Sequence, residues 1–243
     1  MLRTGLKVKN TCNAGFYFWH RVCSNNWMTS EADVKTLLFI TCNLKPKGQS
    51  RSLTVADEFL KKYAEFNPDD RIEFIDTYRD PIQRFDEDVL SGMEKLNCGM
   101  AFASLTQNEQ IKLGKIWASA DKFAEADRYV FVTPMWNLSF PAELKMYLDT
   151  ICVVGKTFIY TGKGPVGLLG GKGKKCLSIH ASGGFHYGTP FDFSVPYLKT
   201  LMKFIGVDDF SSIVIEGVDA QPERAEEFVA HAVERARVEA AVF

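Results

Sequence analysis

Residues 128–149 read RYVFVTPMWNLSFPAELKMYLD. The first part, RYVFVTP, is too apolar to face water on either side, which is typical of a strand in the middle of a parallel sheet. The second part is an amphipathic helical pattern, because Pro141 and Glu143 suit a first helical turn and apolar residues recur on one face. Those apolar residues are Leu144, Leu148 and Ile151. The stretch therefore predicts a buried strand that passes through a turn at Met135–Leu138 into a helix.

Similar apolar runs alternate with helical patterns along the rest of the chain. The predicted strands are Thr36–Thr41, Arg71–Asp76, Tyr129–Thr133, Lys175–Ala181 and Ser212–Glu216. The predicted helices lie near 52–66, 106–125, 139–152, 193–205 and 221–240. Strands that alternate with helices indicate a parallel sheet covered on both faces. We therefore predict an α/β doubly wound fold with a five-stranded parallel sheet, whose ligand binds beyond the carboxyl ends of the strands.

Composition excludes several classes of function. The 243 residues are long enough for one sizeable core, and Lys+Arg (29) nearly balance Asp+Glu (30), so there is no basic footprint for a nucleic acid. No run approaches the ~18 to 20 apolar residues that a membrane span needs. The six cysteines and four histidines show no metal-ligand spacing, so we expect no metal and reduced thiols in the cytoplasm.

The first 27 residues differ from the rest of the chain. They carry four basic residues, no Asp or Glu, and the aromatic cluster Phe16–Trp19. Acid-free basic leaders are typical of targeting segments, so one hypothesis is that residues 1–27 are a disordered or targeting extension. Met28 would then be the natural start, and residues 28–243 the folded domain. An ordered N-terminal arm is the alternative.

Loops that follow the predicted strands carry the candidate ligand contacts. Residues 42–52 read CNLKPKGQSRS and run into a helix, whose first N–H groups and hydroxyls would suit a phosphate. A simple helix cap at Ser52 is the alternative. Residues 180–188 read HASGGFHYG, in which two glycines let a backbone approach a ligand closely. The GxGxxG at 162–167 is interpreted as a chance match, because no helix is expected after it.

Three loops at one sheet edge suit a ligand with a phosphate, a linker and a flat heteroaromatic ring. FMN has that shape. Met135 and Trp136 would pack on the ring, the backbone of Asn137 and Leu138 would meet its polar edge, and the glycines would donate to its carbonyl side. The alternative for Trp136, a core aromatic without a ligand, stays open.

Four ordered sequence blocks resemble a known family. PMWNLSFPAELKMYLD, VGKTFIYTGKGPVGLLGGK, the SGG loop and PYLKTLMKFIGV are similar to the FMN-dependent NADH-azoreductases. These are flavodoxin-like enzymes related to the NAD(P)H:quinone oxidoreductases, and the resemblance runs from about Lys35 to about Arg235. Residues 1–27 have no counterpart in it.

The resemblance implies a flavodoxin-like FMN-binding domain with ten cofactor contacts. These are Asn43, Ser50 and Ser52 for the phosphate, Met135, Trp136, Asn137 and Leu138 for the ring, and Ser182, Gly183 and Gly184 for its polar rim. Arg51 stands where members often carry glutamine or another polar residue, so the resemblance leaves its contact with the cofactor open.

The resemblance also implies the reaction. NADH or NADPH would deliver hydride to flavin N5, leave, and be replaced by a quinone or azo compound that takes two electrons, a ping-pong scheme in which the flavin carries the chemistry. Phe158 and Tyr160 would wall the substrate pocket near the interface of a homodimer. His186 is a candidate for a contact with the flavin edge or for proton donation, although a lone loop histidine is more often a simple polar contact.

The alternative function is a flavodoxin-type electron carrier without NAD(P)H oxidase activity of its own. Such carriers often have a strongly acidic docking surface, whereas this chain has a net charge of −1 and an additional loop at 155–173. The sequence does not distinguish NADH from NADPH, and it does not identify the physiological acceptor.

Overall fold

Five parallel strands form the central sheet of the computed structural model, which describes residues 34–46 and 48–243. The predicted extension at residues 1–27 lies outside the described residues. The sheet has the order β2-β1-β3-β6-β7, and all its strand pairs are parallel. The strands are β1 (Thr36–Thr41), β2 (Arg71–Asp76), β3 (Arg128–Pro134), β6 (Lys175–Ala181) and β7 (Asp209–Ile215). The predicted doubly wound fold is confirmed.

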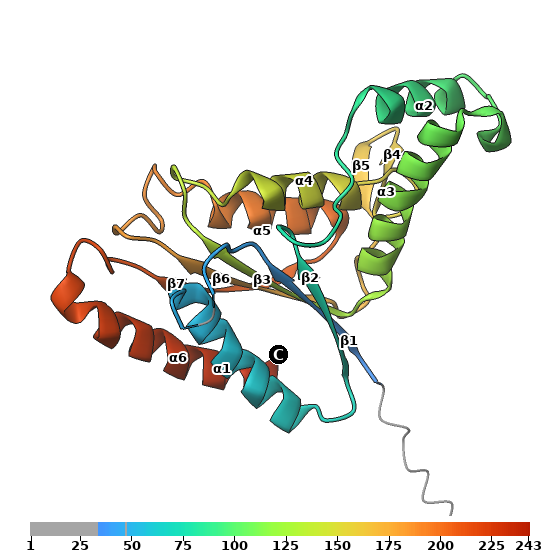
Figure 1. Cartoon of the computed structure of the whole chain (residues 1–243). Coiled ribbons are helices and arrows are strands. Elements are labelled where there is room, and N and C mark those ends of the chain that lie inside the picture. The colour runs from blue at the N-terminus through green and yellow to red at the C-terminus, as the bar shows by residue number, and fades with distance from the viewer. Residues whose placement is uncertain (1–33, 47) are drawn as a thin grey trace, which may run out of the picture. The chain divides into compact units, whose positions relative to one another are not determined.

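Helices cover both faces of this sheet (Figure 1). One face carries α1 (Arg51–Phe66) and α6 (Ala225–Val242), and the other carries α3 (Gln107–Glu125), α4 (Ala142–Ile151) and α5 (Val195–Ile205). Alternate residues of β1 enter the two cores, because successive side chains of a strand point to opposite faces. Leu38 and Ile40 belong to the core with α4 and α5, whereas Leu37 and Phe39 belong to the core with α1 and α6.

Several short elements were not predicted. They are α2 (Glu87–Asn97), β4 (Phe158–Thr161), β5 (Gly164–Gly167) and the 3₁₀ turn η1 (Phe102–Ser104). A second 3₁₀ turn, η2 (Pro222–Arg224), lies within the helix predicted near 221–240, so α6 begins only at Ala225. Strands β4 and β5 form an antiparallel hairpin, and the GxGxxG residues lie in its turn and second strand. Since a strand and not a helix occupies Gly164–Gly167, the interpretation of GxGxxG as a chance match is confirmed.

Helix α2 and the adjoining end of α3 project beyond the sheet (Figure 1). The start of α3 is fixed by a capping box, in which Thr106 and Glu109 each accept a backbone N–H from the other. Glu109 also accepts from Lys95 of α2 at 2.6 Å and from Ser91 at 2.8 Å. These hydrogen bonds lower the pKa of Glu109 to about 2, with that from Lys95 contributing most. One carboxylate therefore joins α2 to α3.

Candidate cofactor-binding site

A cavity of about 260 Å³ opens beyond the carboxyl ends of the strands. Four segments contribute to its wall: the loop from Asn43 to Ser52 after β1, Pro134–Trp136 after β3, Ala181–Gly183 after β6, and Val218–Asp219 after β7. This is the edge at which doubly wound sheets bind ligands. Seven of the ten predicted cofactor residues line the cavity: Asn43, Ser50, Ser52, Met135, Trp136, Ser182 and Gly183.

The loop after β1 builds a polar cradle at the start of α1. Asn43 Nδ2 donates to Ser50 Oγ at 2.7 Å and to Ser52 Oγ at 3.3 Å, and the two hydroxyls lie 3.2 Å apart. All three side chains are buried. Ser50 also caps the helix, because its Oγ accepts the N–H of Leu53. Within the described part of the chain, the N–H groups of Arg51 and Ser52 have no acceptor, and N–H groups at the start of a helix suit an anion.

The turn after β3 has an uncommon backbone. Trp136 N–H donates to Ser139 O at 2.7 Å, and Ser139 N–H donates back to Trp136 O at 3.1 Å. Between them, Asn137 (φ 49°) and Leu138 (φ 70°) both adopt the left-handed region. Asparagine tolerates this region, whereas leucine is strained there. Because the chain turns back here, α4 begins at Ala142 and not at residue 139 as predicted.

This turn leaves Trp136 at the cavity wall with 47% of its surface exposed. Its ring lies against that of Tyr78, with the centroids 6.4 Å apart. Trp136 is therefore not the core aromatic that the sequence left open. Asn137 and Leu138 do not line the cavity, although they form the turn that positions the tryptophan.

The glycine pair after β6 binds the loop after β7 through its carbonyl groups. Gly183 O accepts the N–H groups of Asp219 and Ala220, and Gly184 O accepts that of Gly217. Among the described residues, the N–H groups of Gly183 and Gly184 have no acceptor. A Cβ on Gly183 would lie 2.4 Å from Asp219 Oδ2, so the loop after β7 approaches this glycine closely and the Asp219 side chain would have to move to admit a larger residue.

A buried polar pair lies at the ends of β3 and β6. Thr133 Oγ1 and His180 Nδ1 are 2.8 Å apart, and both residues are almost fully buried. His180 Nε2 is also buried and has no hydrogen-bond partner in the described part of the chain. Burial lowers the pKa of His180 to about 4, opposed by the negative charge of Asp192. The imidazole is therefore neutral at pH 7.

Residues 35–239 match the family described as having a flavodoxin-like fold. The chain is 62% identical to an FMN-dependent NADH:quinone oxidoreductase of Trichlorobacter lovleyi, over 85% of this chain and 99% of that protein. It is 40% identical to FMN-dependent NADH:quinone oxidoreductase 2 of Bacillus subtilis, over 83% and 96%.

Solved structures agree. An azoreductase of Bacillus anthracis superimposes with a TM-score of 0.79 at 33% identity, over 86% of this chain and all of that one. An FMN-dependent NADH-azoreductase from the same species, in complex with FMN, gives 0.78 at 31% identity, over 85% and 98%. The chain belongs to this flavodoxin-like azoreductase and quinone oxidoreductase family. The resemblance noted in the sequence is thereby confirmed.

The residues of this flavodoxin-like site fit FMN. The hydroxyl cradle and the free N–H groups at the start of α1 suit the phosphate, and Trp136 offers a partly exposed ring for stacking. The unsatisfied N–H groups of Gly183 and Gly184 suit the polar edge of the isoalloxazine. Each donor set matches one part of the cofactor.

Sequence reasoning missed the contribution of the loop after β7. Asp219 reaches the cavity from this loop and pairs with Arg51, at 3.0 Å between Oδ1 and Nη1. Lys45 and Gln49 also line the wall. The loop after β7 could have been included, because the last strand of a parallel sheet ends at the same edge as the others.

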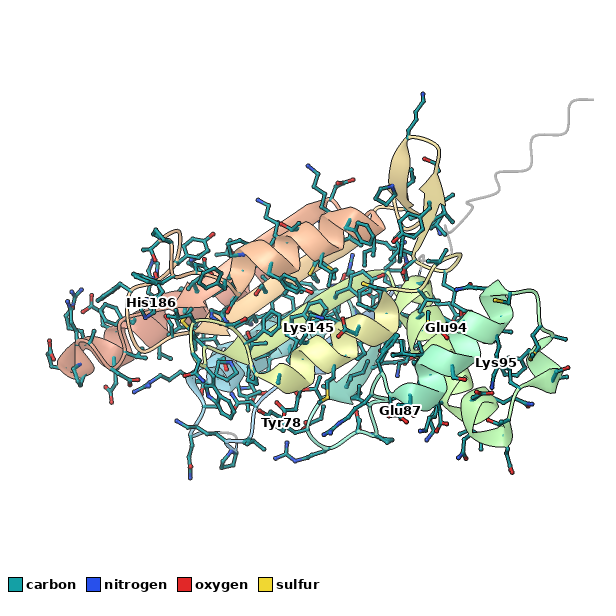
Figure 2. The ribbon with its side chains drawn as sticks, turned by 90° about the horizontal axis from the view of Figure 1, so that it is seen from above. Tyr78, Glu87, Glu94, Lys95, Lys145 and His186 are labelled. Carbon is teal, nitrogen blue, oxygen red and sulfur yellow. The ribbon has the colours of Figure 1, made fainter. Side chains whose placement is uncertain are left out.

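His186 lies near the glycine pair but does not line the cavity. Its backbone N–H donates to Glu216 Oε1 at 2.6 Å, and its ring Nε2 would be 2.7 Å from a Cβ on Gly184. Figure 2 shows it at the end of the molecule where the strand-end loops gather. Its role in contact or proton donation stays a prediction.

Phe158 and Tyr160 do not reach the cavity of their own chain. The β4–β5 hairpin lies at the opposite end of the sheet (Figure 1), because its Leu168–Leu169 continuation bonds to the end of α5 through Leu169 N–H and Ile205 O. Phe158 is buried against Phe204, whereas Tyr160 is 70% exposed. These residues could wall a pocket only with a second copy of the chain, so that role stays a prediction.

The part of the chain that the structure describes contains no helix long and apolar enough to cross a membrane. Across the same residues, no group of three or more His, Cys, Asp or Glu side chains is arranged to hold a metal ion.

Proposed function

We propose that the chain is an enzyme that uses FMN to pass two electrons from NADH or NADPH to quinones and azo compounds. The observation that carries the proposal is a single cavity lined by a hydroxyl cradle, a partly exposed tryptophan and Gly183, whose N–H has no acceptor among the described residues. Membership of a family whose relatives are named FMN-dependent NADH:quinone oxidoreductases supports it.

Bound FMN supplies the hydride chemistry, and the protein supplies binding, orientation and electrostatics. Asn43, Ser50 and Ser52 would hold the phosphate side by hydrogen bonds at the start of α1. Trp136 would orient the ring plane. The N–H groups of the glycine pair would stabilise negative charge at the polar edge of the ring, an effect of the oxyanion-hole type that is worth about 3 kcal/mol per donor in other enzymes.

Donor and acceptor use the site in turn. In this proposal the oxidised nucleotide leaves before the quinone or azo compound enters, which is a ping-pong order. Parallel double-reciprocal plots at several donor concentrations would support this order, and intersecting plots would contradict it. The same kinetics, run with NADH and with NADPH, measure the donor preference.

The decisive assay is turnover by the purified full chain with FMN, either nucleotide, and menadione or methyl red as acceptor. Turnover without a partner reductase supports the enzyme. Bound FMN without turnover would instead support the electron carrier. His186→Ala tests the proton-donor role, since unchanged quinone and azo turnover would leave His186 as a polar contact.

The cradle is tested by Ser52→Ala. This change removes a buried hydroxyl that does not cap the helix, and we expect weaker binding of FMN with little effect on riboflavin, which lacks the phosphate. Thr54→Ala is the matched control. Thr54 lies in the same helix and its hydroxyl donates to Ser50 O at 3.0 Å, but Thr54 does not line the cavity. Equal effects of the two changes would argue against the cradle.

The enzyme is a homodimer in this proposal, since Phe158 and Tyr160 can wall a pocket only with a second copy. Sedimentation at micromolar concentration tests the assembly. A cytoplasmic location is supported by the free thiols of Cys42, Cys98, Cys152 and Cys176.

A further inference from the structure

The rim of the phosphate cradle carries an ion pair from two distant segments. Arg51 is the first residue of α1 and Asp219 belongs to the loop after β7, and their side chains are 40% and 71% exposed. Both residues line the cavity. An ion pair this exposed contributes little to folding, so stability alone does not explain it.

The backbone holds Asp219 at the cavity wall. Its N–H donates to Gly183 O at 2.9 Å, and its carboxylate lies so close to Gly183 that a Cβ there would be 2.4 Å from Oδ2. A negative charge at this place repels a phosphate bound at the start of α1. The carboxylate is therefore compatible with an anionic ligand only if a cation compensates it.

Arg51 provides that positive charge, and Asp219 uses only part of its hydrogen-bonding capacity. A guanidinium carries five N–H donors, and within the described part of the chain Arg51 uses one of them, from Nη1 to Asp219 Oδ1 at 3.0 Å. The remaining donors can reach a second anion, and a planar guanidinium suits both carboxylate and phosphate. The pair thus places a partly satisfied cation above the cradle.

We propose that Arg51 is the cationic partner of the cofactor phosphate, held over the cradle by Asp219, and that this pair makes the site selective for FMN over riboflavin. The inference rests on the proposed FMN-dependent function and deepens it. It assigns opposite effects to the two members of one ion pair: Arg51 attracts the phosphate, whereas Asp219 positions Arg51 but repels the phosphate.

This assignment predicts an order of FMN affinities among three variants. An ion pair that only linked α1 to the loop after β7 would not give that order. Arg51→Gln removes the attraction and leaves Asp219 uncompensated, so it should bind FMN most weakly. Adding Asp219→Asn to that variant removes the repulsion and should restore part of the affinity. Asp219→Asn alone leaves the cation and should bind FMN as tightly as the original chain or more tightly.

The experiment measures dissociation constants of the full-length chain and the three variants for FMN and for riboflavin, by flavin fluorescence at low and at physiological salt. We expect Arg51→Gln to raise the FMN constant at least about tenfold, the size of one charge-assisted hydrogen bond, and to change the riboflavin constant less than about twofold. The salt dependence of FMN binding should also become shallower, since one cation is lost.

Arg224→Gln is the matched control. Arg224 forms a similarly exposed pair with Glu227 at 2.8 Å, with side chains 49% and 63% exposed, and does not line the cavity. It should bind both flavins like the original chain. Thermal unfolding without flavin verifies that every variant is folded.

Distinct results overturn the two proposals. If the original chain binds neither flavin, the proposed function fails. If the original chain binds FMN and Arg51→Gln binds it equally well, the proposed role of Arg51 is wrong. The same holds if Arg51→Gln weakens the binding of riboflavin as much as that of FMN. If Asp219→Asn weakens FMN binding as much as Arg51→Gln, and the double variant binds FMN no more tightly, the ion pair only links two segments of the fold. The charge assignment then fails.

Discussion

Stability should fall steeply as pH drops through the range in which His180 resists protonation. The side chain is almost fully buried, its Nδ1 lies 2.8 Å from Thr133 Oγ1, and its pKa is lowered to about 4 by burial. In the unfolded chain the same imidazole has a pKa near 6.5. Between these two values the unfolded state binds a proton that the folded state does not, so acid favours unfolding.

The magnitude follows from the two pKa values. Each pH unit in this window changes the free energy of unfolding by about 1.4 kcal/mol, and the window spans about 2.5 units. His180 therefore removes about 3 kcal/mol of stability between pH 7 and pH 4, which is a large part of the ~5 to 15 kcal/mol typical of a domain. The contribution is small above pH 6.5, where both states are mostly neutral.

The perturbation that isolates this effect is His180→Asn. The asparagine amide can occupy the position of Nδ1 and keep the hydrogen bond to Thr133, but it cannot be protonated. The smaller side chain lowers stability at pH 7, and this cost does not depend on pH. The free energy of unfolding of the variant should therefore be lower than that of the original chain at pH 7, and it should decrease less steeply as the pH falls.

Urea unfolding at pH 7, 6, 5 and 4, followed by circular dichroism without flavin, measures both slopes. Carboxylates and exposed histidines contribute equally to the two proteins, so the difference between the slopes belongs to His180. We expect the original chain to lose about 3 kcal/mol more than His180→Asn over this range. Parallel pH profiles would show that His180 is not held neutral by burial.

Three other perturbations test the fold. Gly167→Ala should lower the free energy of urea unfolding by about 2 kcal/mol, because its Cβ would lie 2.3 Å from backbone atoms at the end of α5. Gly162→Ala, in the same GxGxxG match, is the control and should be nearly neutral, because its Cβ meets nothing within 4 Å. A thiol reagent should modify Cys98, the one exposed cysteine among residues 34–46 and 48–243, before the other described cysteines, and Cys98→Ser should remove one fast-reacting thiol. The folded pKa of Glu109 is depressed to about 2 by Lys95, so its stabilisation is present above pH 4.5 and is lost as pH falls towards 2; Glu109→Gln should flatten the unfolding profile in that range.

The sheet could be predicted because a strand that is buried on both faces appears in the sequence as a continuous apolar run. Thr36–Thr41 and Arg71–Asp76 have the predicted bounds, and β3 differs from its prediction by one residue at each end. Helix α2 was not predicted, because it projects from the sheet and buries only Val89 and Gly92. Two buried positions do not produce the periodicity that identifies a helix.

The site was predictable only as far as topology determines it. Strand ends in a parallel sheet converge, so seven of the ten predicted contacts line one cavity without any knowledge of side-chain geometry. The pair of Arg51 and Asp219 depends on rotamers and on a separation of 168 residues, and no local pattern encodes it. The same limit applies to Phe158 and Tyr160, whose proposed role depends on a second copy of the chain.

The turn at residues 136–139 has a backbone that local preference does not favour. Two consecutive left-handed residues would normally include glycine, yet the chain has Asn137 and Leu138, and the left-handed region costs a residue such as leucine about 1 to 2 kcal/mol. The paired hydrogen bonds between Trp136 and Ser139, and that from Phe193 N–H to Leu138 O, hold the turn in place. Strain of this kind persists where surrounding contacts impose it, most often at ligand sites. Because this turn is what leaves Trp136 half-exposed at the cavity wall, we infer that the strain serves the position of the tryptophan ring.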